Sequence, residues 1–331
     1  MAEVKAAPRP VTTSGWARQT QHGDVIFWLL TLGFALVLVG LVIAVGVVTY
    51  NGSAEARDRY GWSFLWGVEW NPVATDLAPA AFGAWPAIRG TLLSSLLALL
   101  LAGPTGVAIG IFLAELCPQR LKQPLGMMVE LLAAIPSVIY GLWGVAVFVP
   151  FFTDYVASPI ADTVGQSVPW LAGPVAVGRG LIVTSVVLAL MILPTIAAIT
   201  RDVLQAVPNH QREVLLALGA TRWEVIWLAV LPYARAGILG GVMLGLGRAL
   251  GETMAATMLI GNSTRVEDSL FMPATTAASL IASELTNAND SLHASALIAI
   301  ALVLFGITLL LNLVARYLVW QTARGPAGAR A

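Results

Sequence analysis

The apolar stretch Val25–Tyr50 reads VIFWLLTLGFALVLVGLVIAVGVVTY and contains no charged side chain. A bilayer core about 30 Å thick is crossed by about 20 mostly apolar residues in a helix. The stretch is longer than the apolar region of a cleaved signal peptide, about 7–15 residues, and a polar segment precedes it. It therefore predicts a transmembrane helix that is retained in the protein.

The whole chain has the same apolar character. Of its 331 residues, 58% are hydrophobic and 11% are charged, whereas soluble domains carry about 25% charged residues. The predicted spans are Val25–Tyr50, Ile88–Ala114, Pro124–Phe152, Gly180–Thr200, Gly237–Gly261 and Ala294–Val319. These continuous runs are too long for the strands of an outer-membrane barrel. The prediction is an all-α integral membrane protein with six transmembrane helices, and a soluble enzyme, a disordered chain and a disulfide scaffold are excluded.

Charge placement predicts the orientation. With both termini in the cytoplasm, about two thirds of the 18 Lys and Arg residues lie in cytoplasmic segments, as the positive-inside rule requires. The zero net charge indicates no nucleic-acid partner, and the apolar spans imply membrane lipid around the chain. The predicted organisation is a cytoplasmic tail over 1–24, a first helix and external loop over 25–86, a five-helix core over 87–319 and a cytoplasmic tail over 320–331.

Two features of the sequence leave alternatives open. Pro104, Pro136 and Pro194 lie within predicted spans, where proline is either a tolerated kink or a break beside a substrate path. Trp62, Trp66 and Trp70 follow a four-residue spacing, which predicts one aromatic stripe on an interfacial helix. A docking surface for an external partner is the alternative for this stripe.

The cytoplasmic loop 201–235 is predicted to form two short helices. The first follows Pro208, with Asn209 as its N-cap, and ends at Gly219. The second begins at Thr221, because Thr221-Arg-Trp-Glu224 matches the S/T-x-x-E capping box. Such a hairpin forms a rigid projection on the membrane protein.

The spacing of Glu213, Gly219 and the pair Leu231-Pro232 resembles the EAA loop of ABC importer permeases. Three substitutions depart from that pattern, since Val214 and Leu215 stand in place of its alanines and Ala229 in place of its isoleucine. The resemblance implies that this loop is a coupling helix that docks into a cytoplasmic ATPase. The residues expected at that contact are Glu213, Gly219, Arg222 and Glu224.

A charged pair is predicted inside the fifth span. Arg248 lies near its middle, where a charge costs about 2.5–3.5 kcal/mol on insertion scales. Glu252 follows four residues later, so on one continuous helix the two side chains share a face. A self-compensating structural pair is the alternative, but intramembrane ionisable groups usually line a pathway. Because a guanidinium fork suits oxyanions, the pattern favours an anionic cargo such as phosphate, sulfate or a carboxylate.

The run Gly245–Met254, GLGRALGETM, is similar to phosphate-specific ABC permeases of the PstC type, as are the run Glu130–Gly141 and the segment Trp223–Trp227. The likeness extends over roughly residues 60–320. It implies a type I importer fold in which five core helices follow one extra helix. Its implied phosphate-translocation residues are Arg248, Glu252 and the adjoining Thr253, with Glu130, Ser137 and Tyr140 as further candidates for lining the path.

The resemblance also implies an assembly in the cytoplasmic membrane of a bacterium. Its other members are a second, homologous permease subunit, an ATPase dimer and an external phosphate-binding protein. The chain itself is predicted not to be an enzyme and to hold no cofactor or metal, because it has no Walker A loop, H-E-x-x-H or paired cysteines. Three alternatives stay open: a permease for another oxyanion such as sulfate, an ion-coupled secondary anion transporter, and a structural scaffold.

Overall fold

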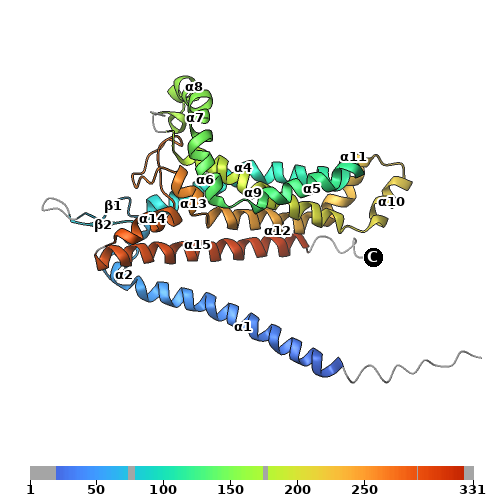
Figure 1. The fold of residues 1–331 in the computed structure, drawn as a ribbon, viewed down its shortest axis with the longest axis horizontal. Coiled ribbons are helices and arrows are strands. Elements are labelled where there is room, and N and C mark those ends of the chain that lie inside the picture. The colour runs from blue at the N-terminus through green and yellow to red at the C-terminus, as the bar shows by residue number, and fades with distance from the viewer. Residues whose placement is uncertain (1–19, 74–78, 174–177, 289, 324–331) are drawn as a thin grey trace, which may run out of the picture. The chain divides into compact units, whose positions relative to one another are not determined.

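A computed structural model describes residues 20–73, 79–173, 178–288 and 290–323, and helices dominate this part of the chain (Figure 1). Six of the helices are long and apolar enough to cross a membrane, which confirms the predicted all-α membrane fold. They comprise Gly23–Gly52, Trp85–Leu116, Ser137–Gln166, Leu181–Gln205, Arg222–Leu250 and Ser291–Thr322. The outer parts of the predicted tails, 1–19 and 324–331, lie outside the described residues.

The chain divides into two compact units, residues 1–51 and 52–331. Helix α1 (Thr20–Gly52) supplies the first unit and already includes residues 20–24, which the sequence assigned to the tail. Almost all its described side chains are exposed. An apolar helix with no buried face is suited to lipid on every side.

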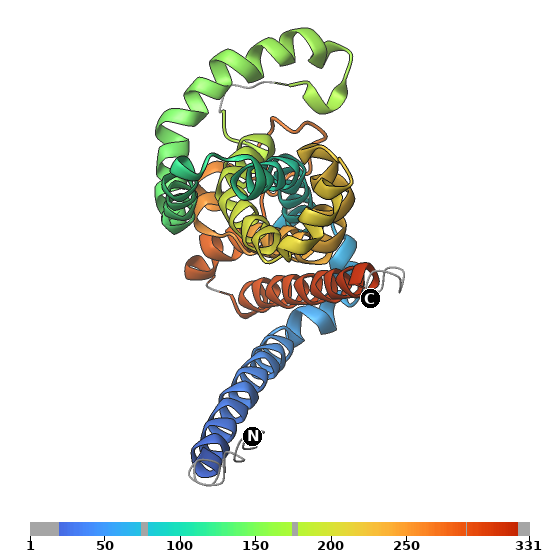
Figure 2. The same ribbon diagram turned by 90° about the vertical axis from the view of Figure 1, so that its right-hand side faces the viewer.

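The second unit is built around helix α9 (Leu181–Gln205), which packs against α4 (Trp85–Ile111), α12 (Leu231–Leu250) and α5 (Gln119–Ala134). Helix α15 (Ser291–Ala323) packs against α12. Figure 2 shows this bundle from a second direction. The large buried side chains of α9 include Leu188, Met191, Ile192 and Ile196.

Glycines allow these helices to approach closely. A Cβ on Gly106 or Gly110 of α4 would lie within 3.0 Å of Ile196 or Thr200, and a Cβ on Gly245 of α12 would lie 2.8 Å from Ile196. Small residues at helix contacts serve this purpose in membranes. The glycines at 241 and 245 therefore form a packing face of α12 against α9, whereas Gly247 faces open space.

The third predicted span is not one continuous helix. Helix α5 ends at Ala134, and α6 (Ser137–Trp143) begins after Pro136. Ile135 adopts an extended conformation, with ψ of 127°, because the residue before proline is disfavoured in the α region. Helices α7 (Val149–Phe152) and α8 (Ser158–Thr163) continue from α6 through two π-helical turns. Pro136 thus marks a break, while Pro104 and Pro194 lie inside continuous helices.

The fifth span is also interrupted, which corrects the predicted run from 237 to 261. A short α11 (Arg222–Val225) and a π-helical turn lead into α12. Helix α12 ends at Leu250, and α13 (Met254–Leu259) begins after three non-helical residues. The irregular backbone at residues 251–253 therefore lies within the predicted run but directly after the spanning helix Arg222–Leu250.

The predicted tryptophan stripe is wrong, because its residues lie on different elements. Trp62 lies in the turn between α2 (Ala54–Tyr60) and α3 (Ser63–Trp66), Trp66 ends α3, and Trp70 lies in the strand β1 (Trp70–Asn71), which pairs antiparallel with β2 (Ala81–Phe82). Gly61, with φ of 55°, ends α2. Trp62 and Trp66 are exposed, whereas Trp70 is buried.

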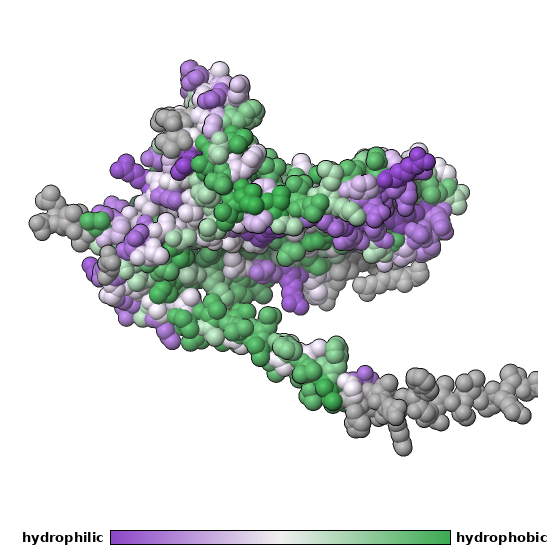
Figure 3. All heavy atoms as spheres, in the orientation of Figure 1, coloured by the Kyte–Doolittle hydropathy of each residue, from purple (hydrophilic) through white to green (hydrophobic). Residues whose placement is uncertain are grey.

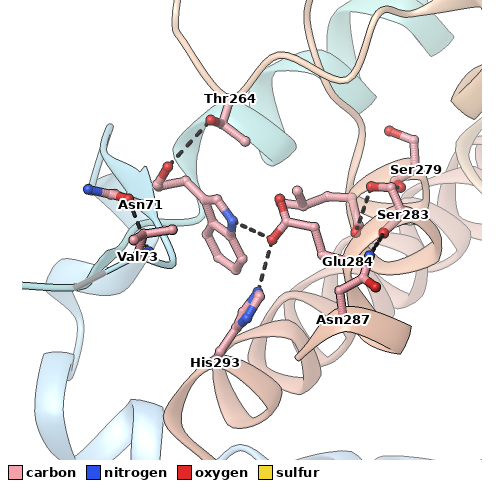
Figure 4. Close-up of polar contacts among 10 residues, drawn as sticks. Asn71, Val73, Thr264, Ser279, Ser283, Glu284, Asn287 and His293 are labelled. Carbon is pink, nitrogen blue, oxygen red and sulfur yellow. Dashed lines mark hydrogen bonds and ion pairs between the residues drawn. The ribbon is translucent and has the colours of Figure 1, made fainter. Parts of the chain in front are cut away.

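Figure 4 shows Glu284, the last residue of α14 (Ala277–Glu284), beside His293 near the start of α15. Trp70 contacts both of these side chains. Its Nε1 donates to Glu284 Oε2 at 2.8 Å, and His293 Nε2 lies 2.9 Å from the same oxygen. The ring of Phe82 stacks on that of His293. These contacts hold the paired strands β1 and β2 against α14 and α15.

Candidate translocation site and coupling helices

Arg248 lies on α12, two residues before the helix ends, and its side chain is half-buried. Its Nη1 donates to Thr195 Oγ1 of α9 at 3.1 Å. At 1.5 Å per residue, Thr195 lies about 21 Å from the Leu181 end of α9 and about 15 Å from the Gln205 end. The guanidinium is therefore held near the middle of a spanning helix.

Among the described residues, no carboxylate lies within 4.0 Å of the Arg248 guanidinium. Thr195 is its one hydrogen-bond acceptor within that part of the chain. An arginine has five N–H donors in a planar fork, so most of them stay available. A half-buried cation with free donors is suited to receive an oxyanion in a bidentate manner.

Glu252 does not share a helical face with Arg248, which corrects the prediction from the four-residue spacing. Because α12 ends at Leu250, Glu252 lies in the interruption, and its Oε1 accepts from Ala255 N of α13 at 3.3 Å. The neighbouring Thr253 Oγ1 donates to Gly251 O at 3.3 Å. The two charges are thus on separate segments.

The surroundings of this interruption are open. A Cβ on Gly247 would meet no atom within 4 Å, and one on Gly251 would meet only a carbonyl of its own helix. At membrane depth, irregular backbone is tolerated where it is buried in protein or lines a watery cavity. Gly247 and Gly251 are exposed, so within this chain the start of the interruption is not covered by other side chains.

The other candidate path residues separate into two groups. Tyr140 of α6 is half-buried within electrostatic range of Arg248, and its hydroxyl donates to Leu132 O at 3.0 Å. Close packing of Gly141 on Ala255 brings α6 against α13. Ser137 begins α6 and is half-buried.

Glu130 belongs to a different cluster. Its Oε1 accepts from Arg201 Nη2 at 2.8 Å, and Arg201 also donates to Asp202. The carboxylates of this cluster are more than half exposed. The ion pair joins α5 to α9 at a point six residues from Thr195.

The loop after α9 forms the predicted helical hairpin. Helix α10 spans Asn209–Ala217, and Gly219 follows with φ of 86°, a conformation that suits glycine. The predicted capping box is confirmed, since Thr221 N donates to Glu224 Oε2 at 2.7 Å and Glu224 N donates to Thr221 Oγ1 at 3.3 Å. Asn209 was predicted as the N-cap but is the first helical residue, and Pro208 occupies the N-cap position.

Exposed apolar side chains accompany the polar residues of this hairpin. Hydrophilic residues gather at the end of the bundle where α10 and α11 lie (Figure 3). Leu218, Trp223 and Trp227 are nevertheless exposed there, as are Glu213 and Arg222. The hairpin therefore presents a mixed apolar and charged surface. Glu224, also exposed, uses its carboxylate in the capping box.

Two contacts of these regions were missed by sequence reasoning. Thr195 fixes Arg248, and the only signal for it is a polar residue after a proline in the fourth span. Arg212 of α10 binds Glu115 from 97 residues away, and no local pattern predicts a pairing over that separation.

Comparisons with known proteins agree with this architecture. Residues 106–322 match the family model described as the binding-protein-dependent transport system inner membrane component. A phosphate transport system permease protein PstC from Mesorhizobium japonicum is 46% identical over 301 residues, covering 90% of each chain. PstC from Pasteurella multocida is 44% identical over 76% of this chain and 78% of its own, and PstC 1 from Mycobacterium tuberculosis is 38% identical over 91% and 94%.

A solved inward-facing MetNI methionine ABC transporter chain has the same fold, with a TM-score of 0.52 and 18% identity over 73% of this chain and 95% of its own. Fold and sequence thus define a membrane transport permease. The chain belongs to the family of binding-protein-dependent transport system inner membrane components, and within it to the PstC permeases. Its relatives are transport permease subunits.

Proposed function

We propose that this chain is the permease subunit of an ATP-driven importer that carries inorganic phosphate across the membrane. The observation that carries the proposal is the Arg248 guanidinium, which donates to Thr195 near the middle of α9 and has no carboxylate partner among the described residues. Relatives that are up to 46% identical are named as phosphate transport permeases. Phosphate presents oxygens that match the guanidinium fork.

Glu252 and Thr253 are proposed to moderate this site. Both lie in the interruption between α12 and α13, close along the chain to Arg248. A carboxylate near the path weakens anion binding through repulsion. Transport requires binding that is strong enough for entry and weak enough for release. Tyr140 and Ser137 are proposed to line the same path from α6, and Glu130 lies closer to the Gln205 end of α9.

The proposed assembly contains a second permease of the same family, an ATPase dimer and an external phosphate-binding protein, in the cytoplasmic membrane of a bacterium. Both termini lie in the cytoplasm, which follows the bias of Lys and Arg. The exposed surface of α10 and α11 docks into the ATPase through Glu213 and Arg222, with Gly219 shaping the turn and Glu224 fixing the second helix. ATP binding moves this hairpin and opens the path outward, and hydrolysis returns it.

Uptake by the purified complex in proteoliposomes tests this function. We expect ATP-dependent accumulation of radiolabelled phosphate that a large excess of sulfate does not reduce. Uptake of sulfate in place of phosphate would support the other-oxyanion alternative. Phosphate uptake by the permease alone, driven by an ion gradient without ATPase subunits, would support a secondary transporter.

Removal of the Thr195 hydroxyl, which accepts a hydrogen bond from Arg248, is predicted to lower phosphate uptake moderately. A Thr195→Val variant keeps the side-chain shape but loses the acceptor for Arg248 Nη1. A hydrogen bond to a charged group contributes about 1.5–3 kcal/mol, and water replaces part of it here, so uptake should fall by roughly 3- to 10-fold. Thr195→Ser retains the hydroxyl and should stay near the wild-type rate. Equal rates for the Val and wild-type proteins would show that Thr195 does not position the arginine.

A further inference from the structure

Arg212 of α10 makes a dense set of contacts at the base of the hairpin. Its guanidinium grips both oxygens of Glu115, with Nη2 at 2.7 Å from Oε1 and Nε at 3.3 Å from Oε2. The side chains of this pair are only 18% and 12% exposed. A bidentate pair with so little solvent fixes the orientation of both partners.

The same guanidinium also joins the end of the fourth span. Nη2 donates to Leu204 O at 2.8 Å, and Nη1 donates to Val207 O at 2.6 Å. Carbonyls at the last turn of a helix lack partners within that helix, so Arg212 caps α9. Glu115 itself lies in the π-helical turn Phe112–Leu116, which ends the second span. One side chain thus connects the hairpin to two spanning helices.

Helix α10 has little other attachment to the bundle. None of its residues is fully buried. Its apolar contact is Leu215, which packs beside the small cluster that includes Leu204, Val207 and Val230. Such a contact is non-directional and permits sliding. The guanidinium contacts are directional, and they therefore determine how α10 is held.

The neighbouring residue faces the other way. Glu213 follows Arg212 directly and is exposed, since adjacent residues on a helix point about 100° apart. Helix α10 thus exposes Glu213 on its outer face, while Arg212 contacts the ends of two spans. The contacts of Arg212 therefore form a rigid connection between the exposed face of α10 and the ends of the two spans.

We propose that the Arg212–Glu115 pair is the link that transmits movement of α10 to the ends of the second and fourth spans. Arg212 and Glu115 are positioning residues, because neither touches the cargo. The inference rests on the proposed function, which supplies the ATPase that moves α10. Its consequence is that weakening the pair uncouples hydrolysis from transport.

Charge-exchange variants test this link in the complete reconstituted complex. The measured quantity is phosphate imported per ATP hydrolysed, normalised to assembled complex. We expect this ratio to fall on the order of tenfold in Arg212→Glu and in Glu115→Arg, because each leaves like charges facing in a buried site. The double exchange should restore a substantial part of it. Arg235→Glu, a reversal at an exposed position of α12, should leave the ratio unchanged.

Milder variants keep the test decisive if the reversals fail to assemble. Glu115→Gln retains the shape and loses the charge, and Arg212→Lys retains the charge and loses the fork. Both should lower the ratio. A ratio equal to wild type in assembled Glu115→Gln and Arg212→Lys complexes, with only the yield reduced, would overturn the link and leave a purely structural pair. A wild-type complex without ATP-driven uptake would instead refute the proposed function, and the link with it.

Discussion

Phosphate uptake should fall to background in an Arg248→Gln variant, while the assembled complex continues to hydrolyse ATP. Glutamine keeps hydrogen-bonding capacity but removes the positive charge and the fork that a mid-membrane oxyanion requires. The loss should exceed about 100-fold, because a charge-assisted bidentate contact contributes about 3 kcal/mol or more in a water-poor site. Radiolabelled uptake and ATP hydrolysis, measured on the same proteoliposomes, check this result.

Two control variants sharpen this experiment. Arg248→Lys keeps a point charge without the fork, so it should retain partial uptake with weaker apparent affinity for phosphate. Arg316→Gln removes another arginine from a spanning helix, at an exposed position of α15, and should transport normally. Normal uptake by the Arg248→Gln complex would rule out a role for this residue in handling the cargo.

The second large effect is structural and concerns Gly90. A Cβ at this position of α4 would lie 1.8 Å from Thr275 O, which is a backbone atom. Thr275 belongs to a buried hydroxyl network that includes Ser279, so the backbone there has little room to move. A Gly90→Ala variant should lose about 3 kcal/mol or more of stability, at the upper end of overpacking costs. Its thermal unfolding midpoint in detergent, or its yield of folded protein, should drop accordingly.

Gly103→Ala is the matched control on the same helix. A Cβ there meets no atom within 4 Å, and alanine favours a helix over glycine by about 1 kcal/mol. This variant should be as stable as wild type or slightly more so. If the Gly90→Ala and Gly103→Ala variants had the same thermal unfolding midpoint, the close approach of α4 to the loop at Thr275 would not limit stability.

Hydropathy and capping rules predicted much of this molecule. Six apolar runs predict six spanning helices, because each run must satisfy its own backbone in lipid. The third and fifth runs are nevertheless displaced from the spanning helices Ser137–Gln166 and Arg222–Leu250. The capping box at Thr221 and Glu224 was predictable because its contacts are local. The glycine turn at 219 follows from the same kind of local rule.

Non-local packing decided the features that the sequence did not predict. The four-residue spacing of Arg248 and Glu252 implied one helical face only if the helix continued, and α12 ends at Leu250. The four-residue spacing placed Trp70 in a predicted aromatic stripe. In the structure Trp70 lies in strand β1, and its indole donates to Glu284. The Arg212–Glu115 pair requires two spanning helices to be in place before its partners meet.

In the proposed function, Arg248 faces water in the middle of the membrane because an anion must pass it. Thiol accessibility tests this directly, in a Cys117→Ser background that removes the one native cysteine. A charged, membrane-impermeant methanethiosulfonate reagent should modify the Arg248→Cys variant in the assembled complex, in either the nucleotide-free or the ATP-trapped state. Leu218→Cys, at an exposed loop position, serves as the positive control. An Arg248→Cys thiol that stays unreactive in both states, while the control reacts, would contradict the account.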